Sequence, residues 1–92
     1  METSTRPLAA DVRRDVQAAL AEIAAGLGYE GPLLPELRLV EDLRLDSIGL
    51  LSLAVAVEDR FEVCLDAADE AAIRTIGDLE RVLLAKLEAG AA

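Results

Sequence analysis

The most informative part of the sequence is residues 46–61, which read DSIGLLSLAVAVEDRF. Apolar residues recur there at three- and four-residue spacing, which predicts a helix that ends at about Phe61. At about 100° per residue around the helix axis, the apolar side chains fall on two stripes, roughly 135° apart. The inner stripe contains Leu50, Leu53, Ala54, Val57 and Phe61, and the outer stripe contains Ile48, Leu51 and Val55.

Only one of the two stripes is needed to pack this helix on a small core. We expect the inner stripe to face the core, because Phe61 is the largest apolar residue available. The outer stripe then lies near the surface beside the helix start, where a partner can reach it. Periodicity alone leaves open the alternative, a helix that is buried on both sides.

A polar pair and a long connection precede this helix. The side chain of either Asp46 or Ser47 can cap its free amide groups. Gly31 and Pro35 exclude a continuous helix over residues 28–46. The connection is rich in leucine, so we expect it to be held against the core, and connections of this length are often functional.

Three further helices are predicted. The first begins near Pro7 and ends at Gly26 or Gly28. Its periodic apolar residues are Leu8, Val12, Val16, Leu20, Ile23 and Leu27. The fold class is therefore all-α, a four-helix bundle with three longer helices and one short helix, and with a long loop between helices 1 and 2.

The short third helix and the last helix follow in the final third of the chain. The short helix fits Ala67–Ile73. Thr75 begins a Thr-x-x-Asp pattern with Asp78, a relative of the capping box, and opens a last helix that runs to about Leu87.

The length and composition describe one small domain. A chain of 92 residues fits a single domain. We expect it to span residues 7–88, between a disordered segment, 1–6, and a flexible end, 89–92. Hydrophobic residues make up 53% of the chain but aromatic residues only 2%, so the core must be aliphatic.

The charge balance points to protein partners. The chain has 18 acidic and 9 basic residues, a net charge of −9. Nucleic acids and anionic membranes are bound by clustered Lys and Arg, so both are excluded as partners. No apolar run approaches the roughly 18 residues of a membrane span, and the N-terminus is unlike a signal peptide. We therefore predict a cytoplasmic protein.

Residues suited to catalysis are scarce. The chain has no histidine and one cysteine, Cys64. A Ser-His-Asp or Cys-His site and an internal disulfide are therefore excluded, and we expect no metal site. Glu41, Asp42 and Asp46 can be imagined as acid and base, but we expect no deep pocket beside them. We predict that the chain is not an enzyme and that Cys64 is a half-exposed bystander.

Three stretches share the pattern of one known family. Residues 40–48, VEDLRLDSI, are similar to a Glu-Asp-Leu-Gly-x-Asp-Ser-Leu motif. Residues 57–61, VEDRF, resemble the acidic, Phe-closed end of the helix that follows this motif, and residues 73–79, IRTIGDL, resemble the entry to the last helix. These are landmarks of the acyl carrier proteins, and the match runs without gaps from about Leu39 to Leu87. The chain resembles a free-standing member of that family.

The resemblance implies a covalent cofactor on Ser47. A separate Mg²⁺-dependent phosphopantetheinyl transferase would move 4′-phosphopantetheine from coenzyme A to Ser47, and acyl groups would then be held as thioesters on the terminal thiol of this arm. Asp46 would act as the helix cap and in recognition by the transferase. Ser47 has no base beside it, so another enzyme must activate its hydroxyl. The other partners implied are acyl-loading enzymes, ketosynthases or acyltransferases, which would meet a monomeric carrier.

The chain departs from the family pattern in ways that bear on its pathway. Arg44 stands where the family usually has Gly. Gly49 and Ser52 stand where carriers of primary fatty acid synthesis tend to have acids, so residues 47–57 carry no charge. This pattern favours a carrier of polyketide or related secondary-metabolite biosynthesis over a housekeeping role.

The predicted partner surface combines the outer stripe with charged residues around it. It comprises Ile48, Leu51, Val55, Glu58, Asp59, Glu62 and Arg44. Apolar contacts would supply most of the affinity, and the acids would mainly quicken encounter. Two alternative functions stay open: an aminoacyl or peptidyl carrier of a nonribosomal pathway, and a carrier-like interaction domain that is never modified.

Overall fold

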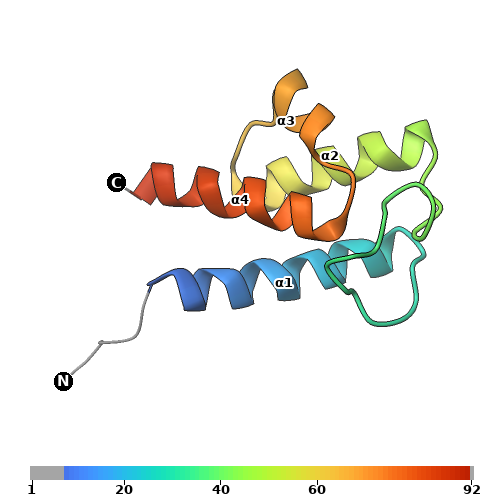
Figure 1. Cartoon of the computed structure of the whole chain (residues 1–92), viewed down its shortest axis with the longest axis horizontal. Helices are drawn as coiled ribbons and strands as arrows, with labels where there is room; N and C mark the ends of the chain where they lie inside the picture. Colours follow the sequence, from blue (N-terminus) through green and yellow to red (C-terminus); the bar gives the residue numbers. More distant parts are fainter. Residues whose placement is uncertain (1–7, 92) are drawn as a thin grey trace.

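The computed structural model describes residues 8–91, with side chains from 12 to 89. These residues form four helices and no strand, namely α1 (Leu8–Gly26), α2 (Ser47–Phe61), α3 (Ala67–Ala72) and α4 (Ile76–Ala91) (Figure 1). The predicted all-α bundle of three longer helices and one short helix is confirmed, and so is the long loop between α1 and α2.

Two helix ends differ from the prediction. α3 ends at Ala72 rather than Ile73, and α4 continues to Ala91, past the expected end near Leu87. Leu87 is followed by Glu, Ala, Gly and Ala, of which only the glycine disfavours a helix. The disorder expected for residues 1–6 and the helix start expected near Pro7 lie outside the described residues.

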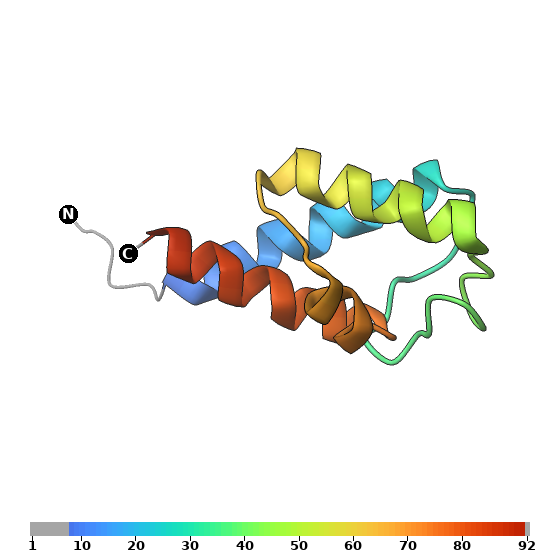
Figure 2. The same cartoon turned by 90° about the horizontal axis from the view of Figure 1, so that it is seen from above.

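α1 is the element against which the bundle is assembled. It contacts both α2 and α4, and Figure 2 shows that α4 crosses the N-terminal part of α1 and diverges from it toward the loop. The largest fully buried side chains come from these three helices and are Val16, Leu20, Val57, Leu79 and Leu83. The core is aliphatic, as the composition predicted.

The two stripes of α2 face as predicted, with one correction. Leu53 and Val57 are buried, whereas the outer stripe is exposed, by 74% at Ile48, 65% at Leu51 and 56% at Val55. The alternative of a helix buried on both sides is therefore wrong. Phe61 was expected in the core, but it is only half-buried against the edge of the core. α2 ends at this residue, so no further turn of the helix covers the ring.

The loop between α1 and α2 is held against the bundle by its backbone and its leucines. Leu39, Leu43 and Leu45 are buried. The Leu39 N–H donates to the Arg74 carbonyl at 3.0 Å, which joins the loop to the segment before α4. The Gly77 N–H donates to a loop carbonyl, that of Pro35, at 2.8 Å. The loop is thus fixed on both sides of the point where it delivers the chain to α2.

Candidate functional site

Ser47 is the first residue of α2, and its side chain is exposed. Asp46, rather than Ser47, is the N-cap: its Oδ1 accepts a hydrogen bond from the Gly49 N–H at 2.7 Å. The capping role predicted for Asp46 is confirmed. Because the carboxylate of Asp46 accepts from one of the free amide groups, that of Gly49, the hydroxyl of Ser47 is not needed as a cap and stays open to another molecule.

The turn before Ser47 depends on an unusual backbone conformation. Arg44 has a φ of 60°, in the left-handed region where glycine is favoured. The side chains on either side of it, Leu43 and Leu45, are both buried and hold the turn in place. A non-glycine residue in this conformation costs about 1 kcal/mol. This explains why a glycine suits this position in the motif, and it leaves the Arg44 side chain exposed beside the site.

Gly49 allows the cap to approach closely. A Cβ atom at this position would lie 3.2 Å from Cδ2 of Leu45 and 3.3 Å from Oδ1 of Asp46. A larger residue would therefore push against both the buried Leu45 and the capping carboxylate. The absence of an acid at this position, read from the sequence as a departure from fatty acid carriers, has a local packing reason.

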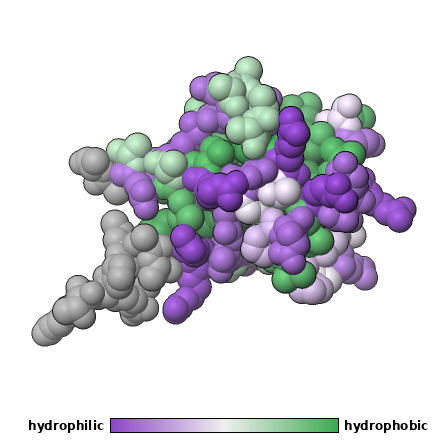
Figure 3. Space-filling model, in the orientation of Figure 1, coloured by the Kyte–Doolittle hydropathy of each residue, from purple (hydrophilic) through white to green (hydrophobic). Residues whose placement is uncertain are grey.

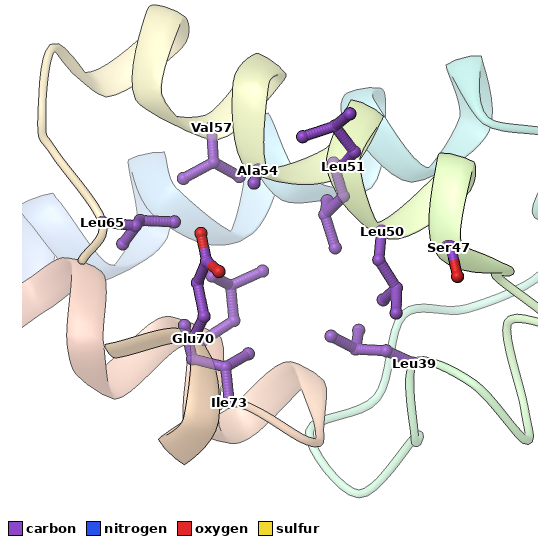
Figure 4. A pocket seen from close by; sticks show the side chains of 11 residues that line it. Leu39, Ser47, Leu50, Leu51, Ala54, Val57, Leu65, Glu70 and Ile73 are labelled. Carbon is purple, nitrogen blue, oxygen red and sulfur yellow. The ribbon is translucent and has the colours of Figure 1, made fainter. Parts of the chain in front are cut away.

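A cavity of about 360 Å³ opens between α2 and α3, with Ser47 in its wall (Figure 4). The wall is formed by Leu39, Ser47, Leu50, Leu51, Leu53, Ala54, Val57, Leu65, Glu70, Ile73 and Leu79. Ser47 and Glu70 are its only polar residues, and Figure 4 shows them toward opposite ends. The sequence predicted no deep pocket beside Glu41, Asp42 and Asp46, and none of these residues lines this cavity, which is formed by side chains from four separate segments.

α3 is attached to the bundle mainly through polar contacts. None of its residues is buried, and Figure 3 shows it as a pale green projection at the top of the molecule. Asp66 caps it, and the Nζ of Lys86 on α4 lies 2.7 Å from Oδ2 of Asp69. The hydrogen bond from Lys86 is the main cause of a lowered pKa of the Asp69 carboxyl, and the same bond raises the pKa of Lys86.

The acids predicted on the partner surface differ in their surroundings. Glu58 is half-buried, and its Oε2 accepts a hydrogen bond from the Leu65 N–H at 2.7 Å. Glu62 is the C-cap of α2, with a φ of 56°, and its side chain is exposed, as is that of Asp59. Glu58 therefore holds the end of α2 to the next segment, and Asp59 and Glu62 are the acids that face solvent.

The described residues offer little for other chemistry. Between residues 12 and 89 there is no group of three or more Cys, Asp or Glu side chains that could hold a metal ion. Cys64 is exposed and unpaired with any other cysteine. None of the four helices in the described range is long and apolar enough to cross a bilayer.

Sequence reasoning found Ser47 and Asp46 but missed Glu70 and most of the cavity wall. Glu70 lies in a short acidic stretch, and nothing in the spacing of that stretch separates it from its neighbours. Leu51 was assigned to the outer stripe, and it also lines the rim of the cavity. The exposure of the outer stripe was the only signal that could have indicated an opening beside α2.

Comparisons with known proteins agree with this geometry. The family model for the phosphopantetheine attachment site matches residues 16–83. A meromycolate extension acyl carrier protein of Mycolicibacterium aurum is 36% identical over 69 residues, 73% of this chain and 71% of that protein. An acyl carrier protein of Desulforapulum autotrophicum is 33% identical over 67 residues, 73% of this chain and 86% of that protein. The acyl carrier protein MbtL of a Mycobacterium species is 42% identical over 52 residues, 56% of this chain and 58% of that protein.

Proposed function

This chain belongs to the phosphopantetheine attachment-site family of acyl carrier proteins, and we propose that Ser47 is the residue that carries its 4′-phosphopantetheine arm. As a member of that family the chain is a carrier and not a catalyst. The observation that carries the assignment of Ser47 is its place at the start of α2, exposed, outside the cap, and in the wall of the cavity.

The attachment reaction needs only an accessible hydroxyl from this chain. The Ser47 Oγ would form a bond to the phosphorus that bears pantetheine, the pyrophosphate bond of coenzyme A would break, and adenosine 3′,5′-bisphosphate would leave. The proton of the hydroxyl passes to a base of the transferase, because this chain has no histidine and Asp46 is engaged in its cap. The new phosphodiester would lie at the N-terminus of α2, where free amides and the helix dipole favour an anion.

The cavity suits an apolar cargo on this arm. A volume of about 360 Å³ lies at the lower end of the range for small-molecule sites, about 300–1,000 Å³. The arm supplies a thiol that holds an acyl group as a thioester, and the leucines of α2 can then remove the chain of that acyl group from water. Burial stabilises a chain by about 0.8 kcal/mol per methylene.

The departures in the motif and the names of the similar proteins support a class of cargo and of pathway. The start of α2 carries no charge from Ser47 to Val57, which fits partners that read an apolar surface and a dedicated role in polyketide or related secondary-metabolite biosynthesis. The similar proteins are named as acyl carriers, one of them in meromycolate extension. An acyl cargo is therefore favoured over the aminoacyl or peptidyl cargo of a nonribosomal pathway. Because the arm comes from coenzyme A, we place the carrier in the cytoplasm. We further propose that it acts as a monomer.

The proposed partner surface is the outer stripe with Arg44 at one end and Asp59 and Glu62 at the other. What supports it is exposure: Ile48 and Val55 are large apolar side chains left in water, and such surfaces mark interaction sites. Ketosynthases, acyltransferases or other acyl-loading enzymes would bind here, after the transferase has bound around Asp46. Glu58 contributes less to partner binding than the sequence suggested, because its carboxylate already accepts a hydrogen bond from the Leu65 N–H.

The test is the intact mass of the full chain after incubation with coenzyme A, Mg²⁺ and a broad-specificity transferase. One phosphopantetheine group should be added to the wild type and to Ser52→Ala, the matched control on the exposed side of α2, but none to Ser47→Ala. A Ser47→Ala protein that is folded by circular dichroism and still modified would overturn the assignment. A wild type that accepts no arm would favour the unmodified interaction domain.

The partner surface is tested separately by Val55→Asp, which should accept the arm and lose loading by its cognate enzyme.

A further inference from the structure

Glu70 is the one charged residue in the wall of the cavity. Figure 4 shows its side chain reaching from α3 toward α2, near Val57 and Leu65. Ten residues of α2 separate Ser47 from Val57, which corresponds to about 15 Å at the rise of an α-helix. A chain that enters beside Ser47 and extends along α2 therefore meets this carboxylate, which is exposed, at the opposite end of the wall.

The acids at the start of α3, beside Glu70, are already engaged. Asp66 and Asp69 exchange hydrogen bonds across the α3 cap, and Lys86 is paired with Asp69. Among the described side chains, the carboxylate of Glu70 accepts no hydrogen bond and forms no ion pair. It is a strong acceptor, exposed to solvent, in an otherwise apolar wall.

This arrangement discriminates between kinds of cargo. A plain alkyl chain that fills the cavity removes water from the carboxylate and offers nothing in return. A chain with a hydroxyl group at the matching depth replaces that water with a charge-assisted hydrogen bond, which is stronger than a neutral one. A polar group that can form a hydrogen bond with only one kind of cargo disfavours a cargo that has no matching donor.

We propose that Glu70 makes the cavity selective for acyl chains that carry a hydrogen-bond donor, a hydroxyl group, over saturated chains of the same length. The proposal rests on the proposed function, because the cargo reaches the cavity through the arm on Ser47. Glu70 is thereby a specificity-determining residue on α3 that lies outside the attachment motif and outside the partner surface.

The test compares cargoes of one length on the intact carrier. The wild type, Glu70→Leu and Glu70→Gln are loaded by the transferase with octanoyl groups or with 3-, 5- or 7-hydroxyoctanoyl groups, each from its coenzyme A thioester. Hydrogen exchange of the amides of α2 and α3 then reports how firmly each cargo fills the cavity. In the wild type, at least one hydroxylated cargo should slow exchange about tenfold more than octanoyl does, the size expected for one hydrogen bond to a charged group.

The variants separate the role of the carboxylate from that of shape. Glu70→Leu should reverse the order, so that octanoyl protects best, and Glu70→Gln should keep part of the preference, since its amide oxygen still accepts. Glu88→Leu, an exposed acid of α4 outside the cavity, should behave as the wild type.

Two results would overturn the inference. The first is equal protection by all cargoes in the wild type, and the second is an unchanged preference in Glu70→Leu. Failure of the arm to attach is seen in the mass before any cargo is compared, and it counts against the proposed function itself.

Discussion

α2 and α3 face each other across the same cavity, yet they are held by different forces. α2 has 15 residues, caps at both ends and the buried side chains Leu53 and Val57. α3 has 6 residues, none of them buried, and depends on its cap and on the ion pair between Asp69 and Lys86. One wall of the cavity is therefore part of the hydrophobic core, and the other is attached to its surface.

The difference assigns separate tasks to the two walls. The proposed role of Ser47 requires a constant position before a transferase and later enzymes, so the helix that carries it gains from anchoring in the core. A wall that admits chains of varied size gains from weak attachment, because segments with few buried contacts open at low free-energy cost. Glu70, on the weakly attached wall, can adjust to a cargo without disturbing Ser47.

The largest effect on stability is expected from shortening a buried side chain of α2, the wall of the cavity that belongs to the core. Leu53→Ala should lower the free energy of unfolding by about 2–5 kcal/mol, because it removes a buried side chain and leaves a void. Val55→Ala, two residues away on the outer stripe, should change it by no more than about 0.5 kcal/mol. Urea unfolding followed by circular dichroism measures both. Similar losses from the two variants would mean that α2 is not anchored by one face alone.

A smaller effect of opposite sign is expected at the ends of α2. Arg44 and Glu62 flank this helix with φ values of 60° and 56°, so each residue is strained where glycine is not. Arg44→Gly and Glu62→Gly should each raise the free energy of unfolding by a few tenths to about 1 kcal/mol, the relief of strain being offset in part by the greater freedom of glycine in the unfolded chain. Arg60→Gly, inside the helix, is the control and should destabilise. Destabilisation by all three would contradict the strain at the two flanking positions.

The smallest effect on global stability is expected from removing the ion pair that attaches α3 to α4. Lys86→Met removes the partner of Asp69 and should barely shift the melting temperature, whereas the amides of α3 should exchange faster and those of α2 should not. An equal change in both helices would remove the distinction between the two walls.

The pH dependence of the same pair gives an internal control. The pKa of Asp69 is lowered in the folded state, so its contribution is complete above its ordinary value of 3.8 and is lost as the pH falls through the lowered pKa. The pKa of Lys86 is raised, so its contribution is complete below its ordinary value of 10.5 and is lost as the pH rises through the raised pKa. The wild type and Lys86→Met should therefore differ in α3 exchange near neutral pH and converge in strong acid. A difference that persists in strong acid would show that Lys86 acts through its packing.

The features predicted correctly from the sequence depend on neighbours in the chain. The bounds of α2 follow from apolar periodicity over a few turns, and its cap depends on Asp46 and the amide of Gly49, three residues away. Thr75 and Asp78 exchange two hydrogen bonds at the same spacing at the start of α4, with both nitrogen-to-oxygen distances 3.1 Å. Such contacts recur wherever the same residues stand at the same spacing, which is why the motif around Ser47 could be read without coordinates.

By itself, the sequence determined the four helices, the two apolar stripes of α2 and the motif around Ser47. Only the tertiary structure decided that Phe61 lies at the edge of the core, that Glu58 is engaged by Leu65, and that a cavity containing Glu70 opens beside Ser47. The physical reason is the range of the interactions. Helices and caps are set by hydrogen bonds between residues three or four apart, whereas the cavity is the space left when side chains from four distant segments pack, and no local pattern encodes it.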